Sequence, residues 1–342
     1  MSKIILTGGG TAGHVTPNLA LVDELKKRFD EVHYIGSREG IERNLVEKRG
    51  DIFYHPVTTV KLIRSFSLKN FTIPYKLLKG ISECKKLIKQ INPSVIFSKG
   101  GFVGLPVCLG AGKVPVILHE SDRTVGLANR LCMKNCAMRL CSFPLDGGFT
   151  QVGAPLRREL YFGDKERARR QCGLRENLPF LLITGGSLGA KAINDAVESA
   201  KEKLTKKFNV VHISGTGECV RECRYFRTPY AENIADFMAL CNFAVSRGGA
   251  NTLFELIALN KPTIVIPLPK GNSRGDQIDN ARYFEKKGCV KVLLQENLTT
   301  DSLLDSLEDL THDENALIRN MSTQKNIDGR QKIIEILSKY AK

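Results

Sequence analysis

Three glycine-rich turns hold the residues of this chain that are best suited to chemistry. They span residues 7–14, 98–106 and 184–190, and each follows a strand-like apolar run. In such a turn, backbone N–H groups and the start of the next helix can hold a phosphate group. One such turn is often only a tight connection, but three of them predict a cleft that grips phosphates from two domains. The candidate phosphate ligands are Gly10, Gly100, Gly101, Gly185 and Gly186.

The first turn also fits the dinucleotide-binding pattern G-x-G-x-x-G, through Gly8, Gly10 and Gly13. That pattern alone is weak evidence, because it also requires an acid about 20 residues further on, at the tip of the second strand. Here the second strand ends in Gly36-Ser37-Arg38, and Arg38 would suit the 2′-phosphate of NADP. The two other glycine turns have no role in a dehydrogenase, so we rank this alternative below a phosphate-gripping cleft.

His14 directly follows the first turn, and its imidazole is our candidate for a general base. A neutral imidazole, with an ordinary pKa of about 6.5, can accept a proton from an attacking hydroxyl at neutral pH. Glu120 and Asp122 lie just past the strand expected at 114–119, at the edge where doubly wound folds place their sites. Either could orient a substrate or share the base role. The structural alternatives are a core histidine and an aspartate that caps a helix.

The composition is that of a folded enzyme with two domains. The chain has 342 residues, of which 42% are hydrophobic and 25% charged, and this length exceeds that of one ordinary core. The apolar start is too short for a signal peptide, and no run approaches the ~20 apolar residues of a membrane span. The ten cysteines have no zinc-ribbon spacing, so we expect them reduced and buried, with no metal site.

Positive charge is concentrated in the first half of the chain. The net charge is +15, of which +10 lies in residues 1–150. Between Ile52 and His119 there are ten Lys or Arg residues and one acid, Glu83. Such a patch attracts a polyanion or an anionic membrane surface. No helix-turn-helix, zinc finger or aromatic RNA-binding signature accompanies it, so we expect no nucleic acid partner.

Strand-like runs alternate with helical stretches throughout, which predicts two doubly wound α/β domains in tandem. The expected strands span 3–6, 32–35, 95–98 and 114–119 in the first domain, then 180–184, 210–214, 243–246 and 263–267 in the second. Gly and Pro at 153–155 mark the joint. We therefore expect domains at 1–158 and 159–328, with a C-terminal helix at about 329–342 that can pack back on the first.

The chain resembles glycosyltransferase family 28, in the branch that adds N-acetylglucosamine to the lipid-linked precursor of bacterial cell wall. Six separated motifs fall in the order and spacing of that family, at 8–17, 98–106, 119–122, 184–190, 246–255 and 276–281. The resemblance implies a GT-B fold, with two Rossmann-like domains facing across a cleft. It also implies inverting transfer from UDP-N-acetylglucosamine to the C4 hydroxyl of the muramoyl sugar of lipid I, which yields lipid II. No essential metal and no cofactor are expected.

The resemblance also implies roles for individual residues. Glu255 would accept hydrogen bonds from the ribose hydroxyls, Ser187 and Arg157 would contact the diphosphate, backbone near Ala231 would read uracil, and Gln277 would contact the sugar. The implied substrate-binding residues are Thr11, Ala12, Gly13, Asp122, Arg157, Ser187, Ala231, Ala250, Asn251, Thr252, Leu253, Phe254, Glu255 and Gln277. The chain departs from the family at Asp122, which is commonly Asn, and at Ala12, which is commonly Gly.

Other readings stay open alongside this one. The nearest is another GT-B transferase of UDP-sugars, or a UDP-N-acetylglucosamine 2-epimerase. Residues 61–79 interleave five cations with apolar side chains and contain no acid, so they could lie on a bilayer or bury their apolar face in the core. We expect lipid I and an anionic inner-membrane surface as partners, peripheral attachment to the cytoplasmic face, and a place in a complex for cell-wall synthesis, cell shape and division.

Overall fold

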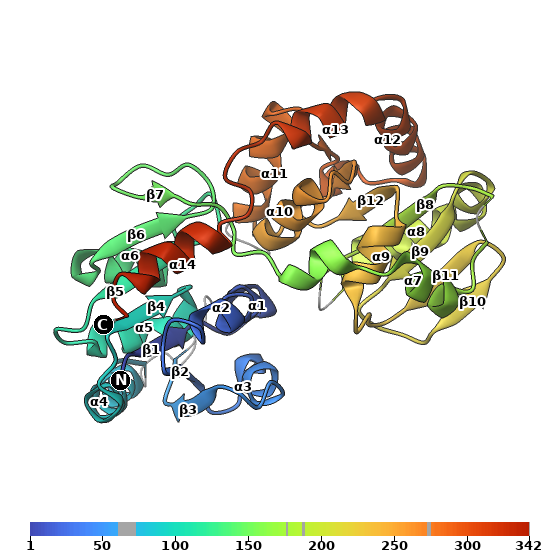
Figure 1. Cartoon of the computed structure of the whole chain (residues 1–342). Coiled ribbons are helices and arrows are strands. Elements are labelled where there is room, and N and C mark those ends of the chain that lie inside the picture. Colours follow the sequence, from blue (N-terminus) through green and yellow to red (C-terminus); the bar gives the residue numbers. More distant parts are fainter. Residues whose placement is uncertain (61–72, 176, 187–188, 272–274, 342) are drawn as a thin grey trace. The chain divides into compact units, whose positions relative to one another are not determined.

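The computed structural model describes residues 1–60, 73–175, 177–186, 189–271 and 275–341. Its compact units are Met1–Arg157 with Asp328–Lys342, and Arg158–Ile327. Each unit is a seven-stranded sheet covered by helices (Figure 1). The structure therefore confirms the predicted pair of doubly wound α/β domains, and each is described by itself below.

The sheet of the first unit is parallel throughout, with the order β3-β2-β1-β4-β5-β6-β7. Its strands are β1 (Lys3–Thr7), β2 (Glu31–Ser37), β3 (Phe53–Val57), β4 (Val95–Ser98), β5 (Val116–Glu120), β6 (Met138–Cys141) and β7 (Thr150–Gln151). Its helices are α1 (Ala12–Leu19), α2 (Val22–Leu25), α3 (Ile41–Glu47), α4 (Ile73–Ile91), α5 (Gly101–Gly110), α6 (Leu127–Cys132), η2 (Met133–Asn135) and α14 (Arg330–Ser338). The strand order reverses between β1 and β4, which is where ligands bind in such sheets.

The central strands of this sheet are buried on both faces, and successive residues along each strand point to opposite sides. Ile4 and Leu6 belong to one apolar cluster, while Ile5, between them, belongs to the other. A strand that is covered on both faces is therefore apolar at most of its positions. This explains why residues 4–6 are all apolar, instead of alternating between apolar and polar side chains.

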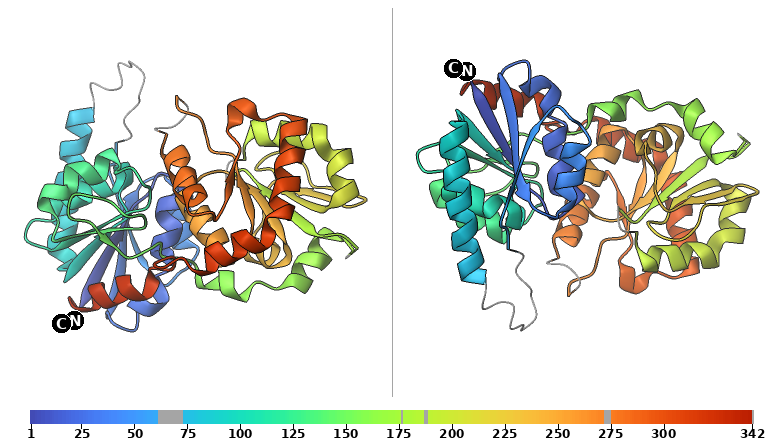
Figure 2. Two further views of the ribbon diagram at one scale, coloured as in Figure 1. Left: turned by 90° about the horizontal axis from the view of Figure 1, so that it is seen from above. Right: turned by 90° about the horizontal axis from the view of Figure 1, so that it is seen from below.

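Helix α14 packs on the first unit, although it lies at the other end of the chain. Ile333, Ile334 and Leu337 are buried in the same cluster as Ile4, and the Gly329 N–H donates to the Ala154 carbonyl at 2.7 Å. In both views of Figure 2, α14 lies beside the amino terminus. The apolar stripe of this helix therefore completes the core of the first unit.

The second unit repeats the doubly wound plan, with the order β10-β11-β9-β8-β12-β13-β14. Its strands are β8 (Phe180–Thr184), β9 (Asn209–Ile213), β10 (Val220–Glu222), β11 (Tyr225–Thr228), β12 (Phe243–Ser246), β13 (Thr263–Val265) and β14 (Lys291–Val292). Its helices are η3 (Arg158–Phe162), α7 (Lys165–Cys172), α8 (Lys191–Lys207), α9 (Ile234–Leu240), α10 (Ala250–Ala258), α11 (Asp276–Lys286), η4 (Gln295–Asn297), α12 (Thr300–His312) and α13 (Glu314–Ser322). Only the β10–β11 pair is antiparallel within the described residues.

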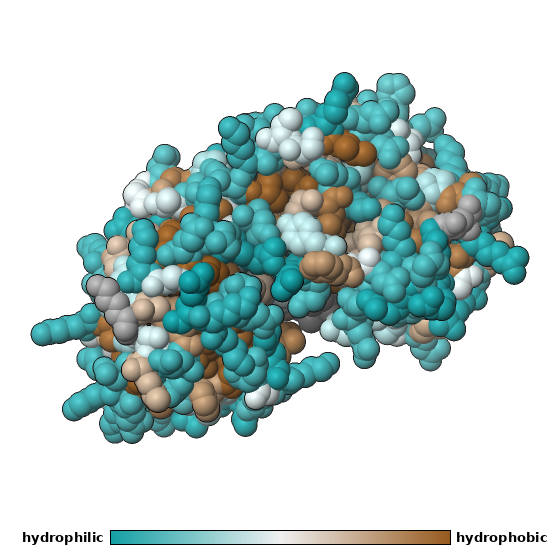
Figure 3. Space-filling model, viewed as in Figure 1, coloured by the Kyte–Doolittle hydropathy of each residue, from teal (hydrophilic) through white to brown (hydrophobic). Residues whose placement is uncertain are grey.

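The exposure of the cysteines corrects one expectation from the sequence. Among the described residues, no helix is both long and apolar enough to cross a bilayer, and the face shown in Figure 3 is mostly hydrophilic with smaller apolar areas. All ten cysteines are free thiols. The expectation that they are buried is wrong for Cys219 and Cys223, which are exposed because they flank the short edge strand β10.

Candidate functional site

The first two glycine turns pack against each other, because β1 and β4 are neighbours and both turns leave the same sheet edge. Gly10 and Gly101 have φ angles of 86° and 74°, a region that favours glycine. A Cβ atom on Gly101 would lie 2.7 Å from the Gly9 carbonyl oxygen, and one on Gly10 would overlap the ring of Phe102. Glycine is thus required on both sides, and Phe102, which the sequence reading missed, lies over the first turn.

A buried carboxylate from α3 holds the first turn in place. The Gly10 N–H donates to Glu42 Oε2 at 3.1 Å. The other oxygen of Glu42 accepts from the backbone N–H and the hydroxyl of Ser37, and Glu42 is fully buried. A phosphate at Gly10 would therefore have to displace an internal hydrogen bond. No sequence signal points to Glu42, since it lies 32 residues from Gly10.

His14 lies where the two turns meet. Its Nδ1 atom is 3.0 Å from Thr11 Oγ1, and a Cβ atom on Gly101 would be 3.6 Å from that same nitrogen. When Nδ1–H donates to Thr11, Nε2 holds the lone pair that a general base requires. Ala12 is the first residue of α1, where helical backbone geometry suits a methyl group as well as glycine.

Glu120 and Asp122 have different surroundings, although both follow β5. Glu120 is 4% exposed, and its Oε1 atom accepts from the backbone N–H groups of Ser121 and Asp122 at 3.0 and 3.2 Å. Its Oε2 atom accepts from Gly126 N–H at 2.9 Å and Asn129 Nδ2 at 2.8 Å. Both oxygens thus organise the loop that follows β5. Asp122 is partly exposed, so it is the better placed of the two carboxylates to meet a substrate.

In the second unit, two glycine turns flank the point where strand order reverses. The third turn follows β8, and a further turn at Gly248–Gly249 follows the neighbouring strand β12. The helices that begin after these turns, α8 and α10, have no side-chain hydrogen bond at their N-caps. Gly185 and Gly186 lie in the described part of the third turn, whereas Ser187 lies outside the described residues.

Several candidate donor ligands are on α10 or beside it. Leu253 and Phe254 are buried in the core, where Phe254 packs edge-on against Phe284 at 5.2 Å, so they can offer a ligand only their backbone. Asn251 and Thr252 are partly exposed, and Glu255 is 7% exposed. A nearly buried carboxylate can select hydroxyl donors, because it only accepts hydrogen bonds.

Gln277 is brought to the same turn by α11. A Cβ atom on Gly248 would lie 2.5 Å from the Gln277 carbonyl oxygen, and Asn280 Nδ2 donates to the Gly248 carbonyl at 3.2 Å. The Gln277 side-chain oxygen accepts from the Leu268 N–H at 3.0 Å. This bond orients the amide, so that its nitrogen is the group that can donate to a sugar.

The remaining candidates are less informative. Ala231 is buried between β11 and α9, where a small side chain leaves only backbone groups to read a base. Arg157 is the last residue of the first of the two chain segments that form the first unit. Among the residues that the structure describes, no cluster of three metal-ligating side chains occurs.

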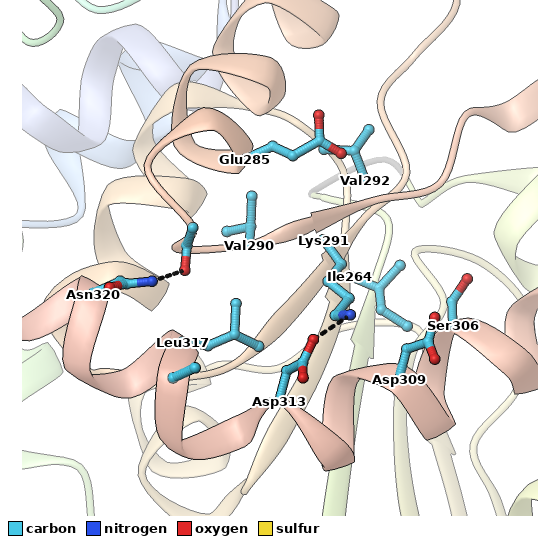
Figure 4. Close-up of a pocket in the computed structure, with 12 residues that line it drawn as sticks. Ile264, Glu285, Val290, Lys291, Val292, Ser306, Asp309, Asp313, Leu317 and Asn320 are labelled. Carbon is cyan, nitrogen blue, oxygen red and sulfur yellow. Dashed lines mark hydrogen bonds and ion pairs between the residues drawn. The ribbon is translucent and has the colours of Figure 1, made fainter.

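One hollow of the second unit lies away from these candidate residues. It has a volume of about 520 Å³ and is lined by β14 and the helices α11 to α13. Figure 4 shows the Lys291–Asp313 ion pair, at 2.7 Å, on one side of it. None of the candidate site residues lines this hollow. The site is therefore better located from the glycine turns than from the shape of the surface.

Two doubly wound units, each with glycine turns where its strand order reverses, are the architecture of the GT-B fold. Models of the N-terminal and C-terminal domains of glycosyltransferase family 28 match residues 4–138 and 180–337. The chain belongs to glycosyltransferase family 28, and within it to the MurG transferases.

The full-length relatives support this assignment. The chain is 46% identical to the "UDP-N-acetylglucosamine--N-acetylmuramyl-(pentapeptide) pyrophosphoryl-undecaprenol N-acetylglucosamine transferase" of Clostridium tetani, over 99% of this chain and 98% of the relative. It is 47% identical to the enzyme of the same name from Clostridium botulinum strain Langeland, over the whole of both chains.

Solved structures agree on the fold. MurG from Acinetobacter baumannii superposes with a TM-score of 0.77 at 21% identity, covering 99% of this chain and all of that one. The UDP-GlcNAc 2-epimerase of Neisseria meningitidis, bound to UDP-GlcNAc, gives 0.66 at 16% identity and covers 99% of both chains. At these identities the likeness is one of architecture. The full-length sequence relatives therefore favour the transferase over the epimerase alternative.

Proposed function

We propose that the chain transfers N-acetylglucosamine from UDP-N-acetylglucosamine to the C4 hydroxyl of the muramoyl sugar of lipid I, with inversion, and so forms lipid II for peptidoglycan synthesis. The observation that carries this proposal is the 46–47% identity, over nearly the whole of both chains, to transferases whose names specify that reaction. The positions of the glycine turns and of His14 are compatible with it.

The proposed mechanism divides the substrates between the units. In the first unit, His14 Nε2 accepts the proton of the attacking hydroxyl, while Asp122 orients the acceptor sugar. In the second unit, Glu255 accepts from the ribose, Gln277 donates to the transferred sugar and Ala231 reads uracil through its backbone. The developing charge of the leaving UDP is stabilised by the N–H groups at the starts of α8 and α10. In this mechanism the charge needs no metal ion.

A transfer assay tests the reaction. The protein is incubated with radiolabelled UDP-N-acetylglucosamine and a short-chain lipid I analogue, and the expected product is a labelled, lipid-linked disaccharide. The same incubation without acceptor is the control. Release of UDP and a 2-epimerised sugar in that control, with no disaccharide when acceptor is present, would show that the protein is an epimerase and not a transferase.

The acceptor is lipid-linked, so we also propose peripheral attachment to an anionic membrane at its cytoplasmic face. The first two turns of α4 support this: Tyr75 and Leu78 are 72% and 67% exposed, and Lys76 and Lys79 are exposed beside them. Apolar groups can enter the bilayer interface while each lysine gains about 1 kcal/mol from anionic headgroups. Residues 61–72 of the basic segment lie outside the described residues. Participation in a complex for cell-wall synthesis is part of the same proposal.

Vesicle sedimentation tests the membrane contact. Leu78→Ser with Lys79→Glu should leave the protein in the supernatant under conditions where wild type pellets with anionic vesicles at low salt. Phe53→Ser with Lys48→Glu is the matched control, since Phe53 is a 57% exposed apolar residue of the same unit and Lys48 is also exposed. Both variants should still bind UDP. Equal pelleting of the α4 variant and the control would remove α4 as the contact.

A further inference from the structure

Lys99 is a buried lysine beneath the two glycine turns of the first unit. It follows β4, directly before Gly100 and Gly101, and it is only 1% exposed. The backbone N–H of Lys99 donates to the Thr7 carbonyl at 2.9 Å. A Cβ atom on Gly8 would lie 3.0 Å from the Cβ atom of Lys99. Lysine is rarely buried this completely. Its inclusion in the basic surface patch between residues 52 and 119 was therefore wrong, because the end of β4 lies enclosed between β1 and β5.

His119 fixes the position of the lysine amine. Lys99 Nζ lies 2.6 Å from His119 Nδ1, and His119 Nε2 lies 3.0 Å from the Gly153 carbonyl oxygen. Because a carbonyl only accepts hydrogen bonds, the imidazole proton is on Nε2, and Nδ1 accepts from Lys99. Burial, together with the nearby Lys99, lowers the pKa of His119 well below its ordinary value. The neutral imidazole therefore acts as a hydrogen-bond acceptor that positions the Lys99 amine.

The charge of Lys99 is sensitive to anions nearby. Burial lowers the pKa of Lys99 to about 7, while the carboxylates of Glu120 and Asp122 act to raise it. Glu120 already accepts four N–H hydrogen bonds, so it does not bind the amine directly. An anion added above the turn would raise the pKa of Lys99 further and hold it protonated.

We propose that Lys99 is a positioning residue for the diphosphate of the lipid-linked acceptor, its ammonium group attracting that anion from below the second glycine turn. The inference rests on the proposed function, since it assigns the acceptor to the first unit. It acts through the electric field and not by contact, because the side chain is covered. The other titratable groups around these turns are His14 on α1, Tyr34 on β2, whose hydroxyl donates to the Gly8 carbonyl, Glu42 on α3, His119 and Glu120 on β5, and Asp122.

The test is the Michaelis constant of each substrate in full-length Lys99→Met and Lys113→Met. Both variants lose one positive charge from the same unit, but Lys113 is exposed and precedes β5, at the opposite sheet edge. Lys99→Met should raise the KM for a short-chain lipid I analogue about tenfold, as expected for one charge acting through protein. The KM for UDP-N-acetylglucosamine should stay within about twofold, and Lys113→Met should match wild type for both substrates.

A pH profile of wild type gives a measurement that needs no variant. The diphosphate of lipid I is a diester, so its charge is constant between pH 6 and 9. Protonated Lys99 attracts it below a pH of about 7, and this attraction is lost as pH rises. The acceptor KM of wild type should therefore rise from pH 6 to 9, whereas that of Lys99→Met should follow a flatter course.

Three outcomes would overturn the inference. The first is an acceptor KM in Lys99→Met equal to that in Lys113→Met, and the second is a flat wild-type profile. The third is loss of thermal stability and UDP affinity together with acceptor affinity, which would make Lys99 only structural. Binding of farnesyl diphosphate, measured by calorimetry, separates the two proposals. If wild type transfers no sugar but Lys99→Met still weakens this probe, the reaction assignment has failed and the anion-positioning role stands.

Discussion

Replacing Glu120 by glutamine distinguishes a scaffold from a chemical base. Each carboxylate oxygen of Glu120 accepts two N–H hydrogen bonds. Glutamine has one oxygen that accepts and one NH2 group that donates. In either orientation of the amide, two N–H groups therefore face another donor in a nearly closed environment. The substitution removes two hydrogen bonds while it leaves the shape of the side chain unchanged.

The cost follows from the number and type of these bonds. A hydrogen bond to a charged group contributes about 1.5–3 kcal/mol, so two of them amount to about 3–6 kcal/mol. A domain of this size loses about 2–4 °C of Tm for each kcal/mol. We therefore expect Glu120→Gln to lower the Tm of the first unit by roughly 10 °C. The loop from Ser121 to Gly126 should become less ordered than the rest of that unit.

Calorimetry and hydrogen exchange measure this outcome directly. The amides of Ser121, Asp122 and Gly126 should lose protection in Glu120→Gln, and transfer activity should fall at every pH. Glu39→Gln is the matched control, because Glu39 is an exposed glutamate of the same unit. Abolished transfer, with Tm and amide protection as in wild type, would refute the scaffold argument and make Glu120 a catalytic group.

Two further substitutions test the proposed substrate contacts. His14→Ala should lower kcat by about 10²-fold or more, as loss of a general base does, with little change in UDP binding; near-normal turnover of the folded variant would eliminate the role. Glu255→Ala should weaken UDP and UDP-N-acetylglucosamine alike, by roughly tenfold to more than a hundredfold, because both contain the ribose. Unchanged UDP affinity in calorimetry would count against that contact.

Much of the fold could be predicted because the central strands are buried on both faces. Apolar runs at 3–6, 95–98 and 180–184 correspond closely to β1, β4 and β8. The edge strands gave no such signal. In β3, Phe53 and Pro56 are exposed, and β10 is largely exposed, so their sequences carry little of the apolar pattern. Such strands form because a neighbouring strand offers hydrogen bonds, which local sequence does not record.

The candidate site was predictable in position but not in detail. A residue placed after a strand must lie at the carboxyl edge of a parallel sheet, which suffices to locate His14 and Glu120. The number of N–H groups that face a carboxylate depends on how the loop folds, so the scaffold role of Glu120 could not be read from its spacing. Glu42 was missed and Lys99 was assigned to the basic patch, because their environments come from strands and turns distant in sequence.

Glu42, Glu120 and Lys99 place buried charge beside the glycine turns of the first unit. In the first unit, the buried carboxylates of Glu42 and Glu120 already occupy backbone N–H groups of the turns and loop, which makes that edge rigid but adds negative charge beneath it. A diphosphate can bind there only if positive charge offsets those carboxylates, and Lys99 is the buried cation in position to do so. In the second unit, the N-cap residues of α8 and α10 make no side-chain hydrogen bond, and the same is true of α1 and α5 in the first unit, so the helix starts of both units can face phosphate. Anion binding in the first unit therefore depends on the protonation of Lys99 as well as on the backbone. Acceptor binding should accordingly respond to pH near neutrality more strongly than donor binding does.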